Sequence, residues 1–254
     1  MAKKKSIRYQ KKFTISGKHL KALCSAVSLL ATVPLCELFF HIILICKPEY
    51  LRVEIELNRL KIWESSSISS TASTPLSLNN IQQGLVGLAE LYNCVQDLLE
   101  SPTIQQSLLK HQMGQLAEEA LGASVGLIDS CGTTRELVLM MKEQVQDLQS
   151  ALRRKAKKNE WSLISEVFVT KSLAFKGEEK TINEVECVDF SLCSYLHSSD
   201  FKVDVPMIQR KLQTLNTGFQ AIEAGTECLS RLLIRNRVCL LNILTPWKIL
   251  HIKI

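Results

Sequence analysis

The stretch that decides the fold is residues 208–243, which read IQRKLQTLNTGFQAIEAGTECLSRLLIRNRVCLLNI. Side chains recur along it in alternating steps of four and three, the heptad spacing of a helical face that packs on other helices. Nine of the eleven positions are apolar: Ile208, Leu212, Leu215, Phe219, Ile222, Thr226, Leu229, Leu233, Asn236, Leu240 and Ile243. The spacing predicts a helix of about 38 residues and roughly 57 Å. We expect it to end at Pro246 and to pack within its own chain rather than on a second one.

A second apolar stripe predicts another long helix upstream. From Ser77 onward seven side chains advance by three or four residues: Leu78, Ile81, Leu85, Leu88, Tyr92, Val95 and Leu99. Ser101-Pro102 is expected to stop this helix, because the residue before a proline avoids the α region, and to start the next with Ser101 as N-cap. Helical spacing continues through Ile104, Leu108, Leu109, Leu116, Ala120, Leu127 and Ile128. These segments would supply the partners that residues 208–243 need.

The next helix boundary is expected at Gly132. A glycine there can adopt the left-handed conformation that ends many helices, and Thr133 to Glu136 has the T-x-x-E pattern of a capping box. A separate helix would follow, with an apolar face formed by Leu137, Met141, Val145, Leu148 and Leu152. Its last turn carries Arg153 and Arg154, whose charges complement the carboxyl end of a helix dipole.

The composition agrees with a helical protein. With 10 Gly and 6 Pro in 254 residues, the chain is poor in the turn residues that β-sandwiches and barrels need. The predicted fold class is therefore all-α, an elongated helical bundle with a long carboxy-terminal heptad-patterned helix. Residues 50–64 alternate at first like a strand and then follow helical spacing. The predicted organisation is a basic and hydrophobic leader (1–47), a short helix with a serine-rich linker from Glu64 (48–77), a helical bundle (78–245) and a tail (246–254).

The positive charge of the chain is concentrated at its amino terminus. Residues 1–21 contain eight lysines and arginines and no acidic residue, so a net charge of +6 for the whole chain leaves about −2 for the rest. A nucleic-acid-binding face on the globular part is therefore not expected. Residues 22–46 follow as the hydrophobic stretch ALCSAVSLLATVPLCELFFHIILIC.

The hydrophobic stretch 22–46 predicts a membrane-associated protein with a single-pass anchor, since a helix of this length can cross a hydrocarbon core of about 30 Å. Three residues oppose a simple span. Pro34 interrupts the helical hydrogen bonds, and Glu37 and His41 lie four residues apart on one helical face. A carboxylate in mid-span costs ~2.5–3.5 kcal/mol. A cytoplasmic protein with a buried or non-native leader is the alternative.

One short string imitates a catalytic motif. Residues 122–126, GASVG, fit the G-x-S-x-G nucleophile elbow, which needs a strand before the serine. The preceding residues, QLAEEAL, are helical in character, so we interpret Gly122 and Gly126 as a small-residue patch that lets two helices approach closely. The five histidines are isolated and no glycine-rich phosphate loop is present. The sequence predicts no enzyme, no catalytic, cofactor-binding or metal-binding residues, no cofactor and no small-molecule substrate.

The nine cysteines are expected to be reduced. They form no C-x-x-C pair, so neither a zinc knuckle nor a redox motif is indicated. Cys94, Cys131 and Cys228 fall on or beside apolar stripes, where a cysteine acts as a small hydrophobe. Reduced thiols favour a reducing compartment.

Four stretches of the chain resemble the plant BYPASS-like family. They are LRVEIELNRLKIWE (51–64), GLAELYNCVQDLL (87–99), LIDSCGTTRELVLMMKEQVQDLQSALRR (127–154) and ECLSRLLIRNRVCLLNIL (227–244). The resemblance covers roughly residues 51–245 and is firmest at 129–133 and 231–244. The leader, residues 159–203 and the tail depart from the family pattern.

The resemblance implies a plant-specific helical domain with a role in root and shoot development and no known catalysis. In the founding branch of the family it implies restraint of a mobile signal derived from the root. It supplies no functional residues. We therefore expect a non-enzymatic developmental regulator that acts through helix packing on a protein partner. A single-pass membrane protein that presents a helical bundle, with no regulatory role of its own, is the alternative.

Overall fold

In the computed structural model, the part of the chain that is described is helical. The described residues are 51–68, 77–110, 114–156, 184–185, 187–188, 191 and 205–251. Five helices are defined within them: α4 (Leu51–Ile68), α5 (Leu78–Glu100), α6 (Pro102–Lys110), α7 (Gly114–Ala156) and α10 (Val205–His251). No strand occurs in these ranges, so the predicted all-α fold with a long carboxy-terminal helix is confirmed. The leader 1–47 and its predicted anchor lie outside the described residues.

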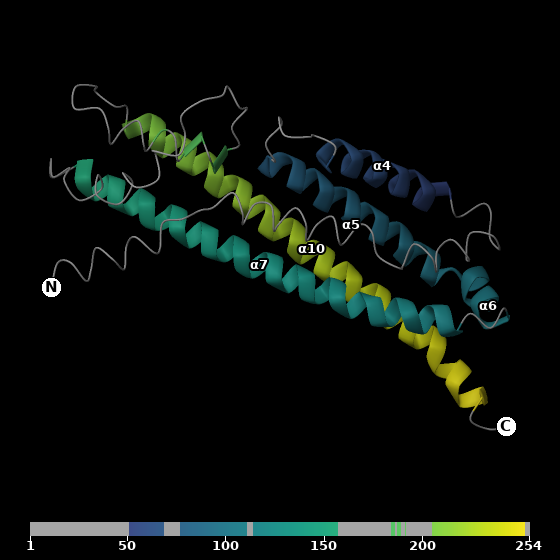
Figure 1. Cartoon of the computed structure of the whole chain (residues 1–254). Helices are drawn as coiled ribbons and strands as arrows, with labels where there is room; N and C mark the ends of the chain where they lie inside the picture. Colours follow the sequence, from purple (N-terminus) through teal and green to yellow (C-terminus); the bar gives the residue numbers. More distant parts are fainter. Residues whose placement is uncertain are drawn as a thin grey trace.

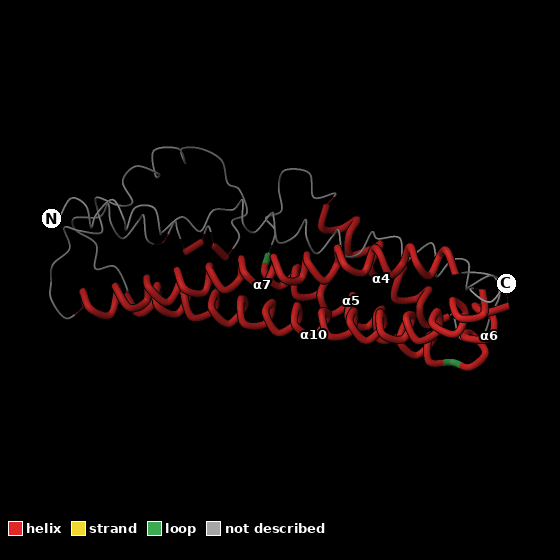
Figure 2. The backbone as a smooth tube through the Cα atoms, turned by 90° about the horizontal axis from the view of Figure 1, so that it is seen from below, coloured by secondary structure: helices red, strands yellow, loops and turns green. Residues whose placement is uncertain are grey.

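The bundle is organised around α10. Both α7 and α5 pack lengthwise on α10, and α4 lies on α5 (Figure 1). α7 runs antiparallel to α10, α5 runs parallel to it, and α4 runs antiparallel to α5. The view from below in Figure 2 shows the same helices side by side along one direction. The described helices therefore form an elongated bundle in which α10 is the shared packing partner.

The predicted stripe of α10 forms the centre of the hydrophobic core. All eleven predicted positions, from Ile208 to Ile243, are buried. Phe219 is the largest of the fully buried side chains. Thr226 is also inside, and its Oγ1 donates a hydrogen bond of 2.8 Å to the carbonyl of Ile222 one turn earlier. Packing within the chain is therefore what buries this stripe.

The predicted boundaries of α5 are confirmed. Ser77 is the N-cap, and its Oγ accepts a hydrogen bond of 3.3 Å from the backbone N–H of Asn80. The seven stripe residues predicted between positions 78 and 99 are all buried. The helix ends at Glu100, with Ser101 as its C-cap in an extended conformation, and α6 begins directly at Pro102.

α5 and α10 approach closely where α10 carries glycine. A Cβ placed on Gly218 would lie 2.8 Å from Leu78 Cδ1, and a Cβ on Gly225 would lie 3.3 Å from Leu85 Cβ. The two glycines are seven residues apart, as are the two leucines, which fixes the parallel register of the two helices. A methyl group at either position would require Leu78 or Leu85 to shift.

Residues 51–64, whose sequence pattern fits a strand in its first half and a helix in its second, are helical throughout. Within α4, Val53 and Leu60 are buried, and Leu60 packs over Gly87 of α5. Trp63 Nε1 donates a hydrogen bond of 2.9 Å to the carbonyl of Asn80. The indole ring occupies the space beside Gly84 of α5, where even a methyl group would collide with it. Burial against α5 therefore decides between the two conformations.

The serine-rich linker begins later than predicted, because α4 continues through Glu64 to Ile68. Ser65 Oγ donates to the carbonyl of Lys61 and Ser66 Oγ donates to that of Trp63, each at 2.8 Å. Serine hydroxyls that donate to carbonyls of the preceding helical turn have a hydrogen-bond partner within the helix, so serines can extend α4. Residues 69–76 of the predicted linker lie outside the described residues.

The predicted helix boundary at Gly132 is wrong, because α7 is one continuous helix of 43 residues. Thr133 Oγ1 donates a 3.1 Å hydrogen bond to the carbonyl of Asp129, four residues earlier, instead of capping a new helix. The buried face runs through the glycine without a break: Leu127, Cys131, Thr134, Val138 and Met141. One glycine in a helix costs about 1 kcal/mol, less than the burial of one leucine side chain returns.

The helix α10 also continues past Pro246, where it was predicted to end, and reaches His251. A proline removes one backbone hydrogen bond and bends a helix, but it does not necessarily terminate it. Ile243 and Leu244 are buried just before the proline. Thr245 Oγ1 donates a hydrogen bond of 2.7 Å to the carbonyl of Leu241, one turn earlier in the same helix.

Candidate functional site

Ser124, the serine of the elbow-like string, lies about three turns into α7 and is buried. Its Oγ donates a hydrogen bond of 2.7 Å to the carbonyl of Leu121 and accepts one of 2.8 Å from Arg237 Nη1 of α10. Arg237 also donates to the Leu121 carbonyl. A nucleophile elbow needs an exposed serine after a strand, and Ser124 is a buried residue within a helix, so it does not form such an elbow. Its hydrogen bond with Arg237 joins α7 to α10 instead.

The glycines on either side of Ser124 were predicted to let helices approach closely, and this prediction is wrong. Gly122 and Gly126 are exposed, and a Cβ on either would meet no atom within 4 Å. Gly122 and Gly126 do lie four residues apart on one face of α7. Ser124, midway between them, faces α10, so the two glycines lie on the side of α7 that faces away from α10. The close approach occurs instead at Gly218 and Gly225.

A second set of polar contacts joins α10 to α5. Asn236 Nδ2 donates a hydrogen bond of 3.1 Å to the carbonyl of Tyr92 in α5. One turn further along, Gln96 Nε2 donates to Cys239 Sγ at 3.2 Å. A polar residue at a single heptad position fixes register at some cost in stability. Together with Arg237, these contacts align α10 on both of its neighbours.

Two of the described cysteines, Cys94 and Cys131, are buried thiols with raised pKa values. Burial raises the pKa of Cys131 to about 11, and it also raises the pKa of Cys94. Both thiols stay protonated at neutral pH, which makes them weak nucleophiles and weak metal ligands. Cys228 is exposed, so the prediction that it packs as a small hydrophobe is wrong. No group of three metal-ligating side chains forms within the described ranges.

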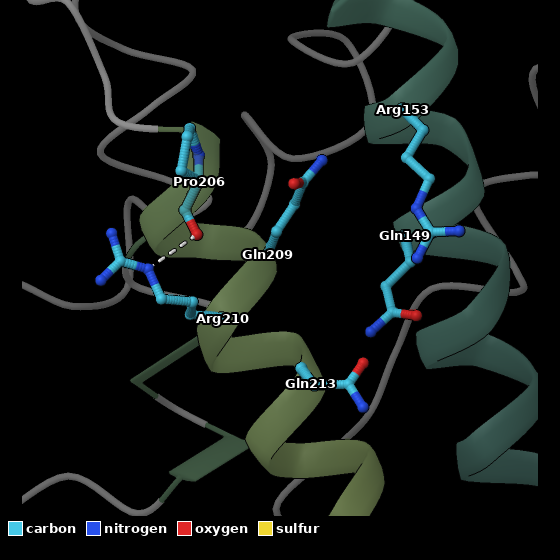
Figure 3. Close-up of a pocket in the computed structure, with 6 residues that line it drawn as sticks. All are labelled: Gln149, Arg153, Pro206, Gln209, Arg210 and Gln213. Atoms are coloured by element: carbon cyan, nitrogen blue, oxygen red, sulfur yellow. Dashed lines mark hydrogen bonds between the residues drawn. The ribbon is translucent and has the colours of Figure 1, made fainter.

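One polar pocket of about 310 Å³ lies where the end of α7 meets the start of α10 (Figure 3). It is lined by Gln149, Arg153, Pro206, Gln209, Arg210 and Gln213. Gln149 and Arg153 of α7 face Gln209 and Gln213 of α10, whereas the Arg210 guanidinium turns back toward its own helix. Its Nε donates to the Pro206 carbonyl at 3.4 Å. The lining has no carboxylate, thiol or imidazole and so lacks groups for acid–base or nucleophilic catalysis.

The described residues also carry an exposed apolar stripe, which we call the α10 stripe: Ile234, Val238 and Leu241. These side chains lie four and three residues apart on one helical face and are 48%, 48% and 44% exposed. Arg231 and Arg235 are exposed on the same part of the helix, and Arg231 pairs with Glu227 at 2.6 Å. The spacing is that of an amphipathic helix which binds another helix. The α10 stripe is the candidate functional site.

The α10 stripe was not predicted, although its three residues lie within the quoted stretch 208–243. The heptad reading assigned one apolar face to residues 208–243 and used Leu233, Asn236 and Leu240 for it. Ile234 and Leu241 each directly follow a residue of that face, and such adjacent apolar pairs are the signal of a second face. Periodicity alone does not reveal which of two faces a neighbouring helix covers.

The fold and the site together define an elongated all-α protein whose long central helix is buried on one face and carries an exposed apolar stripe on another. The family model described as Protein BPS1 matches residues 84–160 and 155–243. These segments include most of α5, all of α6 and α7, and most of α10. The chain therefore belongs to the BPS1, or BYPASS1, family, as the resemblance predicted.

The other comparisons add no relative. The search of curated proteins and the search of solved structures each gave no match. Within the described residues, no helix has a run of apolar residues long enough to cross a lipid bilayer. Family membership points to a regulator of plant development.

Proposed function

We propose that this protein is a non-enzymatic regulator of root and shoot development that acts by binding a partner protein through the α10 stripe. Membership in the BPS1 family supports the developmental role. The observation that carries the binding mode is the line of Ile234, Val238 and Leu241, three large apolar side chains at helical spacing and nearly half exposed. The chemistry of the described polar groups, above all the buried Ser124 and the protonated thiols, supports a role without catalysis.

The partner that fits this surface is an amphipathic helix. Its apolar face would cover the α10 stripe, and an acidic residue beside that face would pair with Arg235, which is exposed. Full burial of an aliphatic side chain gives about 1.5–3 kcal/mol, and nearly half of each stripe residue remains to be buried. The three residues would therefore contribute about 3 kcal/mol, which corresponds to roughly a 100-fold change in affinity.

The test is genetic rescue with matched surface variants of the full chain. Ile234, Val238 and Leu241 are each replaced by glutamine, which keeps helix propensity and removes the apolar surface. The control replaces three exposed apolar residues elsewhere, Val86, Leu139 and Met140, in the same way.

The variants are expressed at equal levels in a plant that lacks the gene. We expect the control to restore root and shoot growth and the stripe variant to fail, while both keep the unfolding temperature of the wild type. Full rescue by the stripe variant would refute the proposed binding mode. Failure of the wild-type chain to restore growth would refute the developmental role.

The alternative of a single-pass membrane protein without a regulatory role of its own depends entirely on residues 22–46. That stretch lies outside the described residues, and the anchor stays a prediction. The same experiment separates the alternatives, because a bundle that is merely presented at a membrane would not lose function when the α10 stripe is changed.

A further inference from the structure

The outer face of α4 is apolar and points away from α5. Leu51, Ile55 and Ile62 are 62%, 48% and 70% exposed, and they lie four and seven residues apart on one face of the helix. The opposite face carries Val53 and Leu60, which are buried. A helix that is apolar on two opposite faces needs a cover for each of them. We call Leu51, Ile55 and Ile62 the α4 outer stripe.

The α4 outer stripe has the spacing of one helix of a coiled coil. Steps of four, three and four residues lead from Leu51 through Ile55 and Asn58 to Ile62, and all four side chains are exposed. In this repeat isoleucine occupies both a positions and leucine occupies the first d position, which is the arrangement that favours two parallel helices. Asn58 occupies the next d position, where its amide can pair with the same amide of an aligned copy.

We propose that α4 pairs in parallel with the α4 of a second copy of this chain, so that the two α4 outer stripes cover each other. This proposal is independent of the function proposed above. The two-fold axis would run along the helices, so each residue of the stripe meets its own counterpart and the assembly closes as a dimer. Because α5 packs on the opposite side of α4 (Figure 1), the bundles of the two copies lie on the far sides of the pair and do not collide.

The charges beside the stripe are complementary in a parallel pair. The residue before an a position then faces the residue five positions later in the partner helix. Glu54 therefore faces Arg59 of the second copy, and the symmetric ion pair forms on the other side of the contact. Both residues are exposed, and Glu54 makes no ion pair within the described part of the chain. Arg59 contacts its own Glu56 at 3.0 Å, yet its side chain is 70% exposed and can accept a second carboxylate.

An antiparallel pair of α4 helices would gain nothing from its charges. With the apolar residues aligned, Arg52 would lie beside Arg59 of the second copy on one side of the contact. On the other side Glu54 would lie beside Lys61, so repulsion and attraction cancel. The amide of Asn58 would also face an aliphatic side chain instead of another amide. The parallel pair has the attraction without the repulsion, which selects its orientation.

The dimer is expected to be weak and reversible. α4 has 18 residues, about five turns, which gives a smaller contact than a standard protein interface. Packing on α5 already holds α4 in its helical form, so little conformational entropy is lost when the second copy binds. We expect a dissociation constant on the order of 10 μM.

The first test is sedimentation equilibrium of the purified full chain over a range of concentrations. Ile55 and Ile62 are replaced together by glutamine, and the control makes the same exchange at Leu139 and Met140, which are exposed on α7. We expect the wild type and the control to approach twice the mass of one chain. The stripe variant should raise the dissociation constant at least tenfold with an unchanged circular dichroism spectrum. A wild type that stays monomeric at about 100 μM, or a stripe variant that associates as the wild type does, would overturn the proposal.

A charge exchange tests the parallel orientation. Glu54→Arg and Arg59→Glu, each alone, should weaken the dimer at least fivefold, because like charges then face each other on both sides of the contact. An equimolar mixture of the two variants should regain the affinity of the wild type, since unlike charges face each other in the mixed pair. In an antiparallel pair Arg59→Glu alone would strengthen the dimer by relieving the repulsion from Arg52. That result, or a mixture no tighter than the single variants, would refute the parallel dimer.

Discussion

Replacing Gly132 with alanine tests whether α7 is one helix or two, because the two alternatives predict opposite signs. In the structure Gly132 lies inside the continuous helix α7, is exposed, and would have no atom within 4 Å of an added Cβ. Alanine is about 0.8–1 kcal/mol better than glycine in a helix interior. Gly132→Ala should therefore stabilise the protein by about that amount, which corresponds to an unfolding temperature higher by about 2–4 °C.

A helix end at Gly132 would give the reverse result. A left-handed glycine at a C-terminal cap tolerates alanine poorly, and the substitution would then destabilise by about 1 kcal/mol or more. The assay is urea unfolding of the full chain followed by circular dichroism at 222 nm, with the free energy taken from the shift of the midpoint at constant slope. A lower midpoint for Gly132→Ala would refute the continuous helix.

Gly84→Ala is the matched control, since it makes the same exchange inside another helix. The added methyl group would collide with the ring of Trp63, which is held by its hydrogen bond to the Asn80 carbonyl. Overpacking of this kind costs about 1–3 kcal/mol, which exceeds the gain in helix propensity. We expect a lower midpoint for Gly84→Ala, so a rise in both variants would show that propensity alone governs the response.

The remaining predictions concern the core and the buried polar groups. Phe219→Ala should destabilise the full chain by about 3–5 kcal/mol in the same urea assay, and Phe219→Asp should abolish cooperative unfolding. A loss below 1 kcal/mol for the alanine variant would contradict the burial of Phe219. Arg237→Met should cost about 1.5–3 kcal/mol, because it removes charged hydrogen bonds to Ser124 and to a backbone carbonyl. Recovery of that loss by Arg237→Lys would argue against the forked contact. The pKa of Cys131 is raised to about 11 from 9.0 because burial disfavours the thiolate. Its contribution to stability is complete below pH 9 and is lost as the pH rises toward 11, so the unfolding midpoint of the wild type should fall more steeply over that range than that of Cys131→Ala. Iodoacetamide at pH 8 should label the exposed Cys228 well before Cys131, and equal labelling would contradict the burial.

The sequence was most informative where a long helix has one dominant apolar face. The stripe of α10 and that of α5 could be read residue by residue, because each repeats every three or four positions and a neighbour covers it along its whole length. The ends of helices were less predictable. Gly132 and Pro246 are local signals for a helix end, but both helices continue through them. Buried residues on both sides of Gly132, and just before Pro246, outweigh these local signals.

The features that depend on distant partners were not predictable from local patterns. Gly218 and Gly225 have a role only because α5 places two leucines against them, about 140 residues earlier in the chain. The same holds for the candidate site. Its residues stand out only once the structure shows that the adjacent face of α10, and not theirs, is covered.

The order of the helices along the chain has a consequence for biosynthesis. α5 and α7 both pack mainly on α10, which follows both of them along the chain. Until α10 has been made, α5 can pack on α4, but the faces of α5 and α7 that pack on α10 have no native counterpart and stay open to non-native pairing. A premature stop before Val205 would therefore yield an insoluble product, and not a partly working protein.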